Sequence, residues 1–357
     1  MVKSSSISKL ADVARRAGVG NATVSRALNG GKNVGTEKMA RILAAVEDLN
    51  YRPNRVARLL RGASSGIIGM VVPSISDLFY SHCAESVEAV VREHNALLVV
   101  VATHDEVAAI SQTVQNLMLH QIDGLVMACP KAPDQRVINL LREAKIPVVA
   151  IDGPLTEVGC PSVLCANFDG AVMATEHLLE HGYRKVISVQ IKPELYTMRE
   201  RLRGYRSAIK AAGRNIYEET ITDQASAIEV LRRYCGRKNP PGIFAANNLT
   251  ARYLCEAVHI LGLSIPRELA LLSFDDFDLA ETLTPPMSVV RQPLEQIGRT
   301  AARLLFEQKA DSDAGSKSRS DQRIFLSPQL ILRQSCGCAH RKRTPSAVVP
   351  RRLTGRT

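Results

Sequence analysis

The sequence lacks any long apolar run. No window reaches the roughly eighteen consecutive apolar residues of a membrane-spanning helix, although 45 % of the 357 residues are hydrophobic. Residues 1–8 are polar and contain no apolar segment of the kind found in secretory signals. We therefore expect a cytoplasmic protein whose apolar residues form the cores of two or three domains.

The eight cysteines lack the regular spacing of a disulfide framework. They stand at positions 83, 129, 160, 165, 235, 255, 336 and 338, which suits reduced thiols in a cytosol. Cys336 and Cys338 are two soft metal ligands, but a zinc site usually takes four, and His340 is the only obvious neighbour. We interpret the pair as two thiols in a flexible tail, and we expect no metal ion.

Motifs typical of enzymes are incomplete or stand in the wrong context. Residues 62–66 fit G-x-S-x-G, yet a nucleophile elbow needs a strand before the serine and a helix after it, and here that order is reversed. His177 and His181 fit H-x-x-E-H, but Gly182 ends their helix, and the segment lies far from the predicted ligand cleft. No P-loop, complete dinucleotide fingerprint or Ser-His-Asp set can be placed. We expect neither an enzyme nor a cofactor.

The basic residues are concentrated at the two ends of the chain. Residues 1–61 hold twelve Lys or Arg against four Asp or Glu, and residues 316–357 hold ten against one. Because the whole chain has a net charge of +11, residues 62–315 have a net charge of −6. A basic head on an acidic body indicates that nucleic acid binds the head. The residues after Cys338 are rich in Arg, Pro, Thr and Ser, which is typical of a disordered tail.

Three short helical patterns follow one another in residues 9–50. Apolar residues recur at helical spacing at positions 10, 13, 14 and 17, then at 24, 27 and 28, and then at 39, 42, 43, 46 and 49. Gly18 suits the left-handed cap that ends the first helix, and a tight turn leads into the second. The pattern predicts a helix-turn-helix with a third helix, in which the second helix is displayed outward.

The second helix carries groups suited to DNA. Asn21 and Arg26 have the donors and acceptors that pair with base edges in the major groove, and Ala22 leaves room for a thymine methyl group. Hydroxyl and amide groups that fix register on the phosphates stand at Thr23, Ser25 and Asn29. The alternative is a small helical bundle with a solvated basic face.

Further motifs extend this stretch to residue 61. Asp12-Val13-Ala14, Gly18-Val19, residues 22–26, Leu28-Asn29 and residues 51–61 together resemble the headpiece and hinge of the lactose-repressor/galactose-repressor family of bacterial transcription regulators. The resemblance continues to about residue 335. It implies a repressor that binds operator DNA in the bacterial nucleoid.

Residues 54–60 are good helix formers after Pro53, but a helix of this length is too short to be stable alone in water. The resemblance implies that two such hinge helices pair in the minor groove and that Leu60 inserts between base pairs. It also implies that Tyr51 and Asn54 contact the DNA backbone. The alternative makes Leu60 an ordinary core residue.

From Gly66 onward, short apolar runs alternate with amphipathic helical patterns. The predicted strands are 67–72, 97–102, 124–128, 147–151, 163–166, 185–190, 242–246 and 270–274. Alternation of this kind indicates parallel sheets, here in two α/β units with a cleft between them. With the resemblance, the expected fold class is α/β, with an N-terminal helix-turn-helix headpiece and a two-lobed periplasmic-binding-protein-like sensor domain.

Polar residues follow the predicted strands, which is where ligands bind in open α/β folds. Asp152, Arg201 and Asp275 combine carboxylate acceptors with a guanidinium donor, and this suits a polyol such as a sugar. The resemblance implies that ligand contacts come from both lobes, at Asp77, Phe79, Tyr80, Arg201, Asn247 and Asp275.

Each of these acids has a plainer alternative as a helix cap or a loop carboxylate, and we prefer that interpretation for Asp169 and Asp276. Lys131 and Lys192 fall near the predicted mouth of the cleft. They extend the candidate ligands to sugar acids, although a solvated lysine is the commoner case.

We therefore expect a headpiece (1–53), a hinge helix and linker (54–65), an effector-binding and dimerising body (66–335) and a basic disordered tail (336–357). The predicted function is transcriptional repression by a homodimer on a near-palindromic operator, controlled by a sugar or sugar derivative. The direction of that control stays open. The alternatives are a sugar-binding protein or a sugar-modifying enzyme without operator-specific function.

Overall fold

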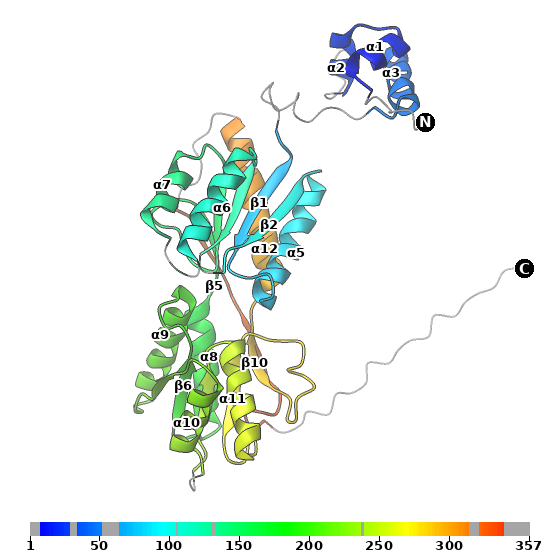
Figure 1. The fold of residues 1–357 in the computed structure, drawn as a ribbon. Helices are drawn as coiled ribbons and strands as arrows, with labels where there is room; N and C mark the ends of the chain where they lie inside the picture. The colour runs from blue at the N-terminus through cyan, green and yellow to red at the C-terminus, as the bar shows by residue number, and fades with distance from the viewer. Residues whose placement is uncertain are drawn as a thin grey trace, which may run out of the picture. The chain divides into compact units, whose positions relative to one another are not determined.

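The computed structural model describes residues 8–28, 34–51, 64–104, 106–129, 131, 133–236, 239–313 and 321–338. The chain divides into two compact units, residues 1–65 and residues 66–357 (Figure 1). Within the described residues, no helix has the length and apolar character needed to cross a membrane.

In the first unit, which we call the headpiece, the described residues form three short helices around one small core. They are α1 (Leu10–Ala17), α2 (Asn21–Leu28) and α3 (Thr36–Asp48). Each helix contributes a buried side chain to this core, among them Val13, Val24 and Ile42. Gly18 adopts the left-handed conformation (φ 65°) that ends α1. The predicted helix-turn-helix with a third helix is confirmed.

The second unit, the body, begins with a lobe built on a six-stranded parallel sheet. Its strand order is β11-β5-β4-β3-β1-β2. The strands are β1 (Ile67–Val72), β2 (Leu97–Ala102), β3 (Gly124–Ala128), β4 (Val148–Ile151), β5 (Ser162–Cys165) and β11 (Arg323–Leu326). The helices of this lobe are α5 (Leu78–Glu93), α6 (Val107–Leu119), α7 (Gln135–Glu143) and α12 (Leu294–Asp313).

The second lobe repeats this design. Its sheet has the order β12-β10-β9-β8-β6-β7, and only β12 runs antiparallel to its neighbour. The strands are β6 (Val186–Gln190), β7 (Glu218–Thr220), β8 (Gly242–Ala245), β9 (Ala270–Phe274), β10 (Ser288–Arg291) and β12 (Gln329–Ile331). The helices are α8 (Asn167–Glu180), α9 (Tyr196–Ala211), α10 (Gln224–Tyr234) and α11 (Asn248–Leu261).

Three segments cross between the lobes. β5 leads into α8, β10 leads back into α12, and β11 leads into β12 (Figure 1). Each crossing leaves the carboxyl end of a parallel strand, so the carboxyl ends of both sheets meet where the lobes join. The two α/β units expected from the sequence are present. The sequence predicted one lobe followed by the other along the chain, whereas in the structure α12 and β11 return to the first lobe.

Candidate functional site

The second helix of the headpiece presents its polar face to solvent. Asn21, Ala22 and Arg26 are exposed, whereas Val24 and Ala27 are buried against the core. An exposed polar face on a helix whose back is fixed by packing is the arrangement that a major-groove reading helix requires.

The other predicted DNA contacts have different positions. Thr23 and Ser25 are partly exposed at the edges of this face. Tyr51 is buried in the headpiece core with 8 % of its surface exposed, a packing role that the sequence interpretation did not give it. Asn29, Asn54 and Leu60 lie outside the described residues, and their contacts stay predictions.

In the body, Asp152 and Asp275 occupy matching positions in the two lobes. Asp152 directly follows β4, and Asp275 directly follows β9. Both have a left-handed backbone, with φ of 67° and 71°. Aspartate tolerates this conformation better than most residues, and backbone of this kind is concentrated at functional sites.

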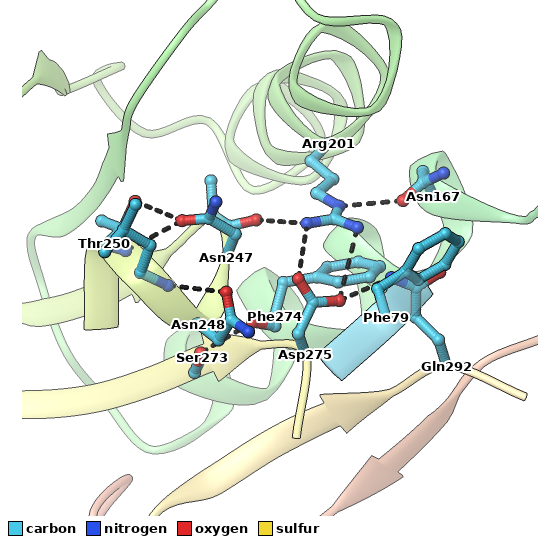
Figure 2. A network of polar contacts seen from close by, with 12 residues as sticks. Phe79, Asn167, Arg201, Asn247, Asn248, Thr250, Ser273, Phe274, Asp275 and Gln292 are labelled. Atoms are coloured by element: carbon cyan, nitrogen blue, oxygen red, sulfur yellow. Dashed lines mark hydrogen bonds and ion pairs between the residues drawn. The ribbon is translucent and has the colours of Figure 1, made fainter. Parts of the chain in front are cut away.

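Arg201 forms the centre of a polar network in the second lobe (Figure 2). Its Nη1 donates to Asp275 Oδ2 at 3.1 Å and to the Ala246 carbonyl at 2.7 Å, and its Nε donates to Asn167 Oδ1 at 2.8 Å. The guanidinium also lies over the Phe274 ring, 3.7 Å from its centroid. Because Arg201 is only 2 % exposed, these partners and not water stabilise its positive charge.

Close helix packing brings Arg201 to this place. α9 lies so near α8 at Gly204 that a Cβ there would stand 2.2 Å from the Phe168 carbonyl oxygen. A larger residue would push α9 away from α8 and separate Arg201 from Asn167.

The first lobe contributes a second carboxylate. The Tyr80 hydroxyl donates to Asp152 Oδ2 at 2.8 Å. The charges of Asp77, Arg201 and Asp275 all act on Asp152, so the two lobes bring these groups into one electrostatic neighbourhood. The structure therefore brings together most of the residues that the resemblance implied.

Two of the predicted ligand contacts also cap helices. Asp77 accepts from the Phe79 amide at 2.9 Å and begins α5. Asn247 Oδ1 accepts from the amide and the hydroxyl of Thr250, at 2.8 and 2.6 Å, and begins α11. At these two positions the plainer alternative of a helix cap describes at least one of the side-chain oxygens.

Sequence reasoning missed two members of the network. Gln292 Nε2 donates to Asp275 Oδ1 at 2.6 Å, and Asn167 accepts from Arg201. Asn167 directly follows the predicted strand 163–166, so it could have been chosen as a polar residue at a strand end. Gln292 follows β10, a strand that was not predicted from the sequence, so no pattern marked Gln292 as a residue of the site.

An open pocket of about 860 Å³ lies beside this network. Its lining comes from the start of α5, the loop after β9 and the crossing from β10 to α12, and includes Phe79, Asp275 and Gln292. The other predicted contacts, Asp77, Tyr80, Asp152, Arg201 and Asn247, are not among the lining residues. Phe79 and Asp275 thus join the pocket to the polar network.

Neighbouring charged residues are engaged in ion pairs. Asp276 binds Arg291 at 2.6 Å and Arg333 at 3.2 Å, which agrees with the preferred loop role of this acid. Lys131 pairs with Glu194 at 3.0 Å. The lysine proposed as a sugar-acid contact therefore already has a carboxylate partner.

The surroundings of Asp152 disfavour its charge. Burial raises the pKa of this carboxyl from its usual 3.8 to about 6, and the charges of Asp77 and Asp275 act in the same direction. The Tyr80 hydrogen bond and Arg201 oppose the rise. Asp152 is therefore an acceptor whose charge changes near neutral pH.

Comparison with known proteins gives matches to both units. A model for bacterial regulatory proteins of the lacI family matches residues 9–54, and a model for a periplasmic binding protein-like domain matches residues 175–336. The chain is 30 % identical over 335 residues to the HTH-type transcriptional repressor PurR of Photobacterium profundum, covering 91 % of this chain and 97 % of the relative.

Two further similarities extend over nearly the same length. A ribose operon repressor of Halalkalibacterium halodurans is 31 % identical over 329 residues, with 91 % of this chain and 96 % of the relative covered. A crystal structure of the lac repressor dimer bound to operator and the anti-inducer ONPF aligns with a TM-score of 0.79 at 23 % identity, covering 93 % of this chain and 99 % of that chain.

The raised pKa of Asp152 predicts a pH-dependent stability difference. Above pH 6 the Asp152 carboxylate is charged in both states, but it is buried in the native protein and hydrated in the unfolded chain, so its ionisation lowers the free energy of unfolding. As the pH falls from about 6 to 3.8, the carboxyl of the native protein is protonated before that of the unfolded chain, and this destabilisation disappears. We expect Asp152→Asn to raise the free energy of unfolding by about 2 kcal/mol above pH 7 and by less at lower pH. Denaturant titration from pH 4 to 8 measures this difference.

Asp169→Asn is the control, because it removes an exposed carboxylate from α8. Its difference from the unmodified protein should be the same across this pH range. A pH-independent effect of Asp152→Asn would contradict the assigned environment of this carboxyl.

Proposed function

The chain belongs to the lacI family of bacterial regulatory proteins, and from this premise we propose that it is a repressor that binds a near-palindromic operator as a homodimer under the control of a small effector. The observation that carries this proposal is the exposed face of α2, where Asn21, Ala22 and Arg26 stand over a buried core. These groups suit base edges in the major groove. Relatives aligned over nearly the whole chain are transcriptional repressors, which argues against the sugar-modifying enzyme and the stand-alone sugar-binding protein.

We assign the effector to the polar network and the pocket beside it. In the polar network, Asp152 and Asp275 lie near one guanidinium, Arg201, which is already paired. Six acids and three arginines line the pocket, and the arginines are all engaged in ion pairs, so the groups available to a ligand are mainly acceptors. A ligand with many hydroxyl donors satisfies such acceptors, whereas an anionic ligand is repelled by them. This favours a neutral sugar or related polyol over a sugar acid.

Control of DNA binding then follows from the three crossing segments. A ligand that contacts Asp275 also acts on Gln292, which lies in the crossing from β10 to α12. Movement of one lobe against the other about these segments is a hinge-type change that leaves both sheets intact. In the proposed dimer it alters the spacing of the two hinge segments (residues 54–65) and hence of the two headpieces, in the cytoplasm and on the nucleoid.

The DNA-reading role of α2 predicts a specific loss. Arg26→Ala should weaken binding to the preferred operator by about 1–3 kcal/mol and relax sequence preference, because a base contact carries both affinity and discrimination. Selection of a preferred duplex from a random library, followed by titration at fixed salt, measures both quantities.

Lys38→Ala is the matched control, since it removes one exposed positive charge from α3 instead of α2. It should lower the affinity for all duplexes slightly and equally. Equal effects of the two variants on sequence preference would contradict the role of α2.

The effector assignment is tested at Asp275. Asp275→Asn keeps an oxygen that can accept from Arg201 and Gln292 but loses the charge, and hydrogen bonds to charged groups are worth about 1.5–3 kcal/mol. We expect sugar affinity to fall by about 10- to 150-fold while operator binding without sugar is retained. Calorimetric titration, with the pentose or hexose that most raises the melting temperature of the unmodified chain, provides the measurement.

Asp223→Asn controls for the loss of a carboxylate charge elsewhere in the second lobe. Asp223 caps α10 by accepting from the Ser226 amide at 2.8 Å and is not among the lining residues of the pocket, so this variant should leave sugar affinity within about twofold. If Asp275→Asn bound the sugar as tightly as the control, the ligand would have to lie elsewhere.

A further inference from the structure

Four potential metal ligands converge at the end of α8 that is remote from the polar network. They are His177, His181, Cys336 and Cys338, and their ligand atoms all lie within 4.8 Å of one another. We propose that these four side chains bind one zinc ion. The site is separate from the DNA-reading helix and from the effector network.

The distances fit a tetrahedral ion. His177 Nε2 lies 3.2 Å from Cys336 Sγ and 3.6 Å from Cys338 Sγ, and His181 Nε2 lies 3.1 Å from Cys338 Sγ. Zinc–nitrogen and zinc–sulfur bonds of about 2.0–2.3 Å place tetrahedral ligand atoms about 3.3–3.8 Å apart. The other separations among the four ligand atoms are at most 4.8 Å, so an ion at the centre requires shifts of no more than about 1 Å.

The chemistry of the donor set selects the class of ion. Two thiols and two imidazoles are the ligands that zinc takes in closed structural sites, while magnesium and calcium prefer oxygen. Among the described residues, the cluster contains no carboxylate ligand. The two histidines come from the last turn of α8 and the residue that ends it, where the helix dipole favours a cation.

Protein contacts hold Cys336 in place before any ion binds. Cys336 is fully buried, and the Ser288 hydroxyl donates to its sulfur at 3.1 Å. The preceding Ser335 is also fully buried, and its hydroxyl accepts from the Ser288 amide at 2.8 Å. Such outer contacts orient a ligand and are a regular part of metal sites.

Gly337 allows the turn between the two cysteines. Its φ is 99°, and a Cβ there would stand 2.7 Å from the Tyr183 hydroxyl oxygen. Only glycine fits this conformation at this distance. The turn thereby brings both sulfur atoms to the same side of α8.

The proposed site joins segments that are distant in the sequence. Residues 177 and 336 are separated by 159 positions, and each motif alone supplies only half of a zinc site. The structure also corrects the interpretation of Cys336 and Cys338 as part of a flexible tail, since Cys336 belongs to the body core. The ion is thus a clasp that fixes the residues after β12 to α8.

Cobalt is the probe for the ligand set. The full chain is reduced with a phosphine, stripped with a chelator and titrated with Co²⁺ alone. We expect the visible bands of tetrahedral cobalt and a near-ultraviolet thiolate-to-cobalt band, both saturating at one ion per chain and lost when Zn²⁺ is added. Zinc should also raise the melting temperature of the stripped protein.

Variants at the two more accessible ligands preserve the fold for this test. Cys338→Ser and His181→Gln should each weaken zinc binding by at least about tenfold, because loss of even an outer-shell partner costs about 10- to 100-fold. Cys255→Ser, which removes a thiol of α11 outside the cluster, should bind as the unmodified chain does. Absence of the cobalt bands, bands that survive both ligand variants, or a Cys336–Cys338 disulfide as the stable state of the reduced and reoxidised chain would each overturn the proposal.

Discussion

The buried ion pair between Arg201 and Asp275 is the contact on which the arrangement of the second lobe depends. One guanidinium connects α9 to Asn167 at the start of α8, to the Ala246 carbonyl after β8 and to Asp275 after β9. Because this charge is only 2 % exposed, it is stabilised by these partners instead of by water, and together they hold the four elements in one arrangement. Asp275 also accepts from Gln292 in the crossing from β10 to α12, so a ligand bound to this carboxylate, as proposed, would compete directly with a contact of that crossing segment.

Local patterns were sufficient for most strands and insufficient for their assembly. The predicted strands at 67–72, 97–102, 124–128 and 270–274 are β1, β2, β3 and β9 with the same bounds, because buried parallel strands form continuous apolar runs between turns. Strands β10, β11 and β12 and the helix α12 were not predicted. The position of α12 depends on packing against α5 and the first sheet, residues about 200 positions earlier, and no local pattern contains that information.

The candidate site shows the same division. Asp152 and Asp275 could be chosen from strand ends, since parallel strands place such residues at one edge. Arg201 lies within α9, and the resemblance was needed to choose it. Their hydrogen-bond partners could not be predicted in this way, because these partners depend on distances between side chains in the folded protein. Asp77 and Asn247 illustrate the difference, because each begins a helix and uses a side-chain oxygen as its cap. A carboxylate after a strand satisfies both descriptions, and only the distances separate them.

Helix α8 links the two chemical sites of the body. Its first residue, Asn167, accepts from Arg201, and its last turn carries His177 of the proposed zinc clasp. At about 1.5 Å per residue these ends are about 15 Å apart, and a helix is stiff over that length. The clasp would fix β12, and through it the end of the crossing from β11, to the same helix that positions the effector network. A second lobe made rigid in this way would transmit the contacts of the proposed effector to the crossing segments, because little of the binding energy would be lost in deforming the lobe itself.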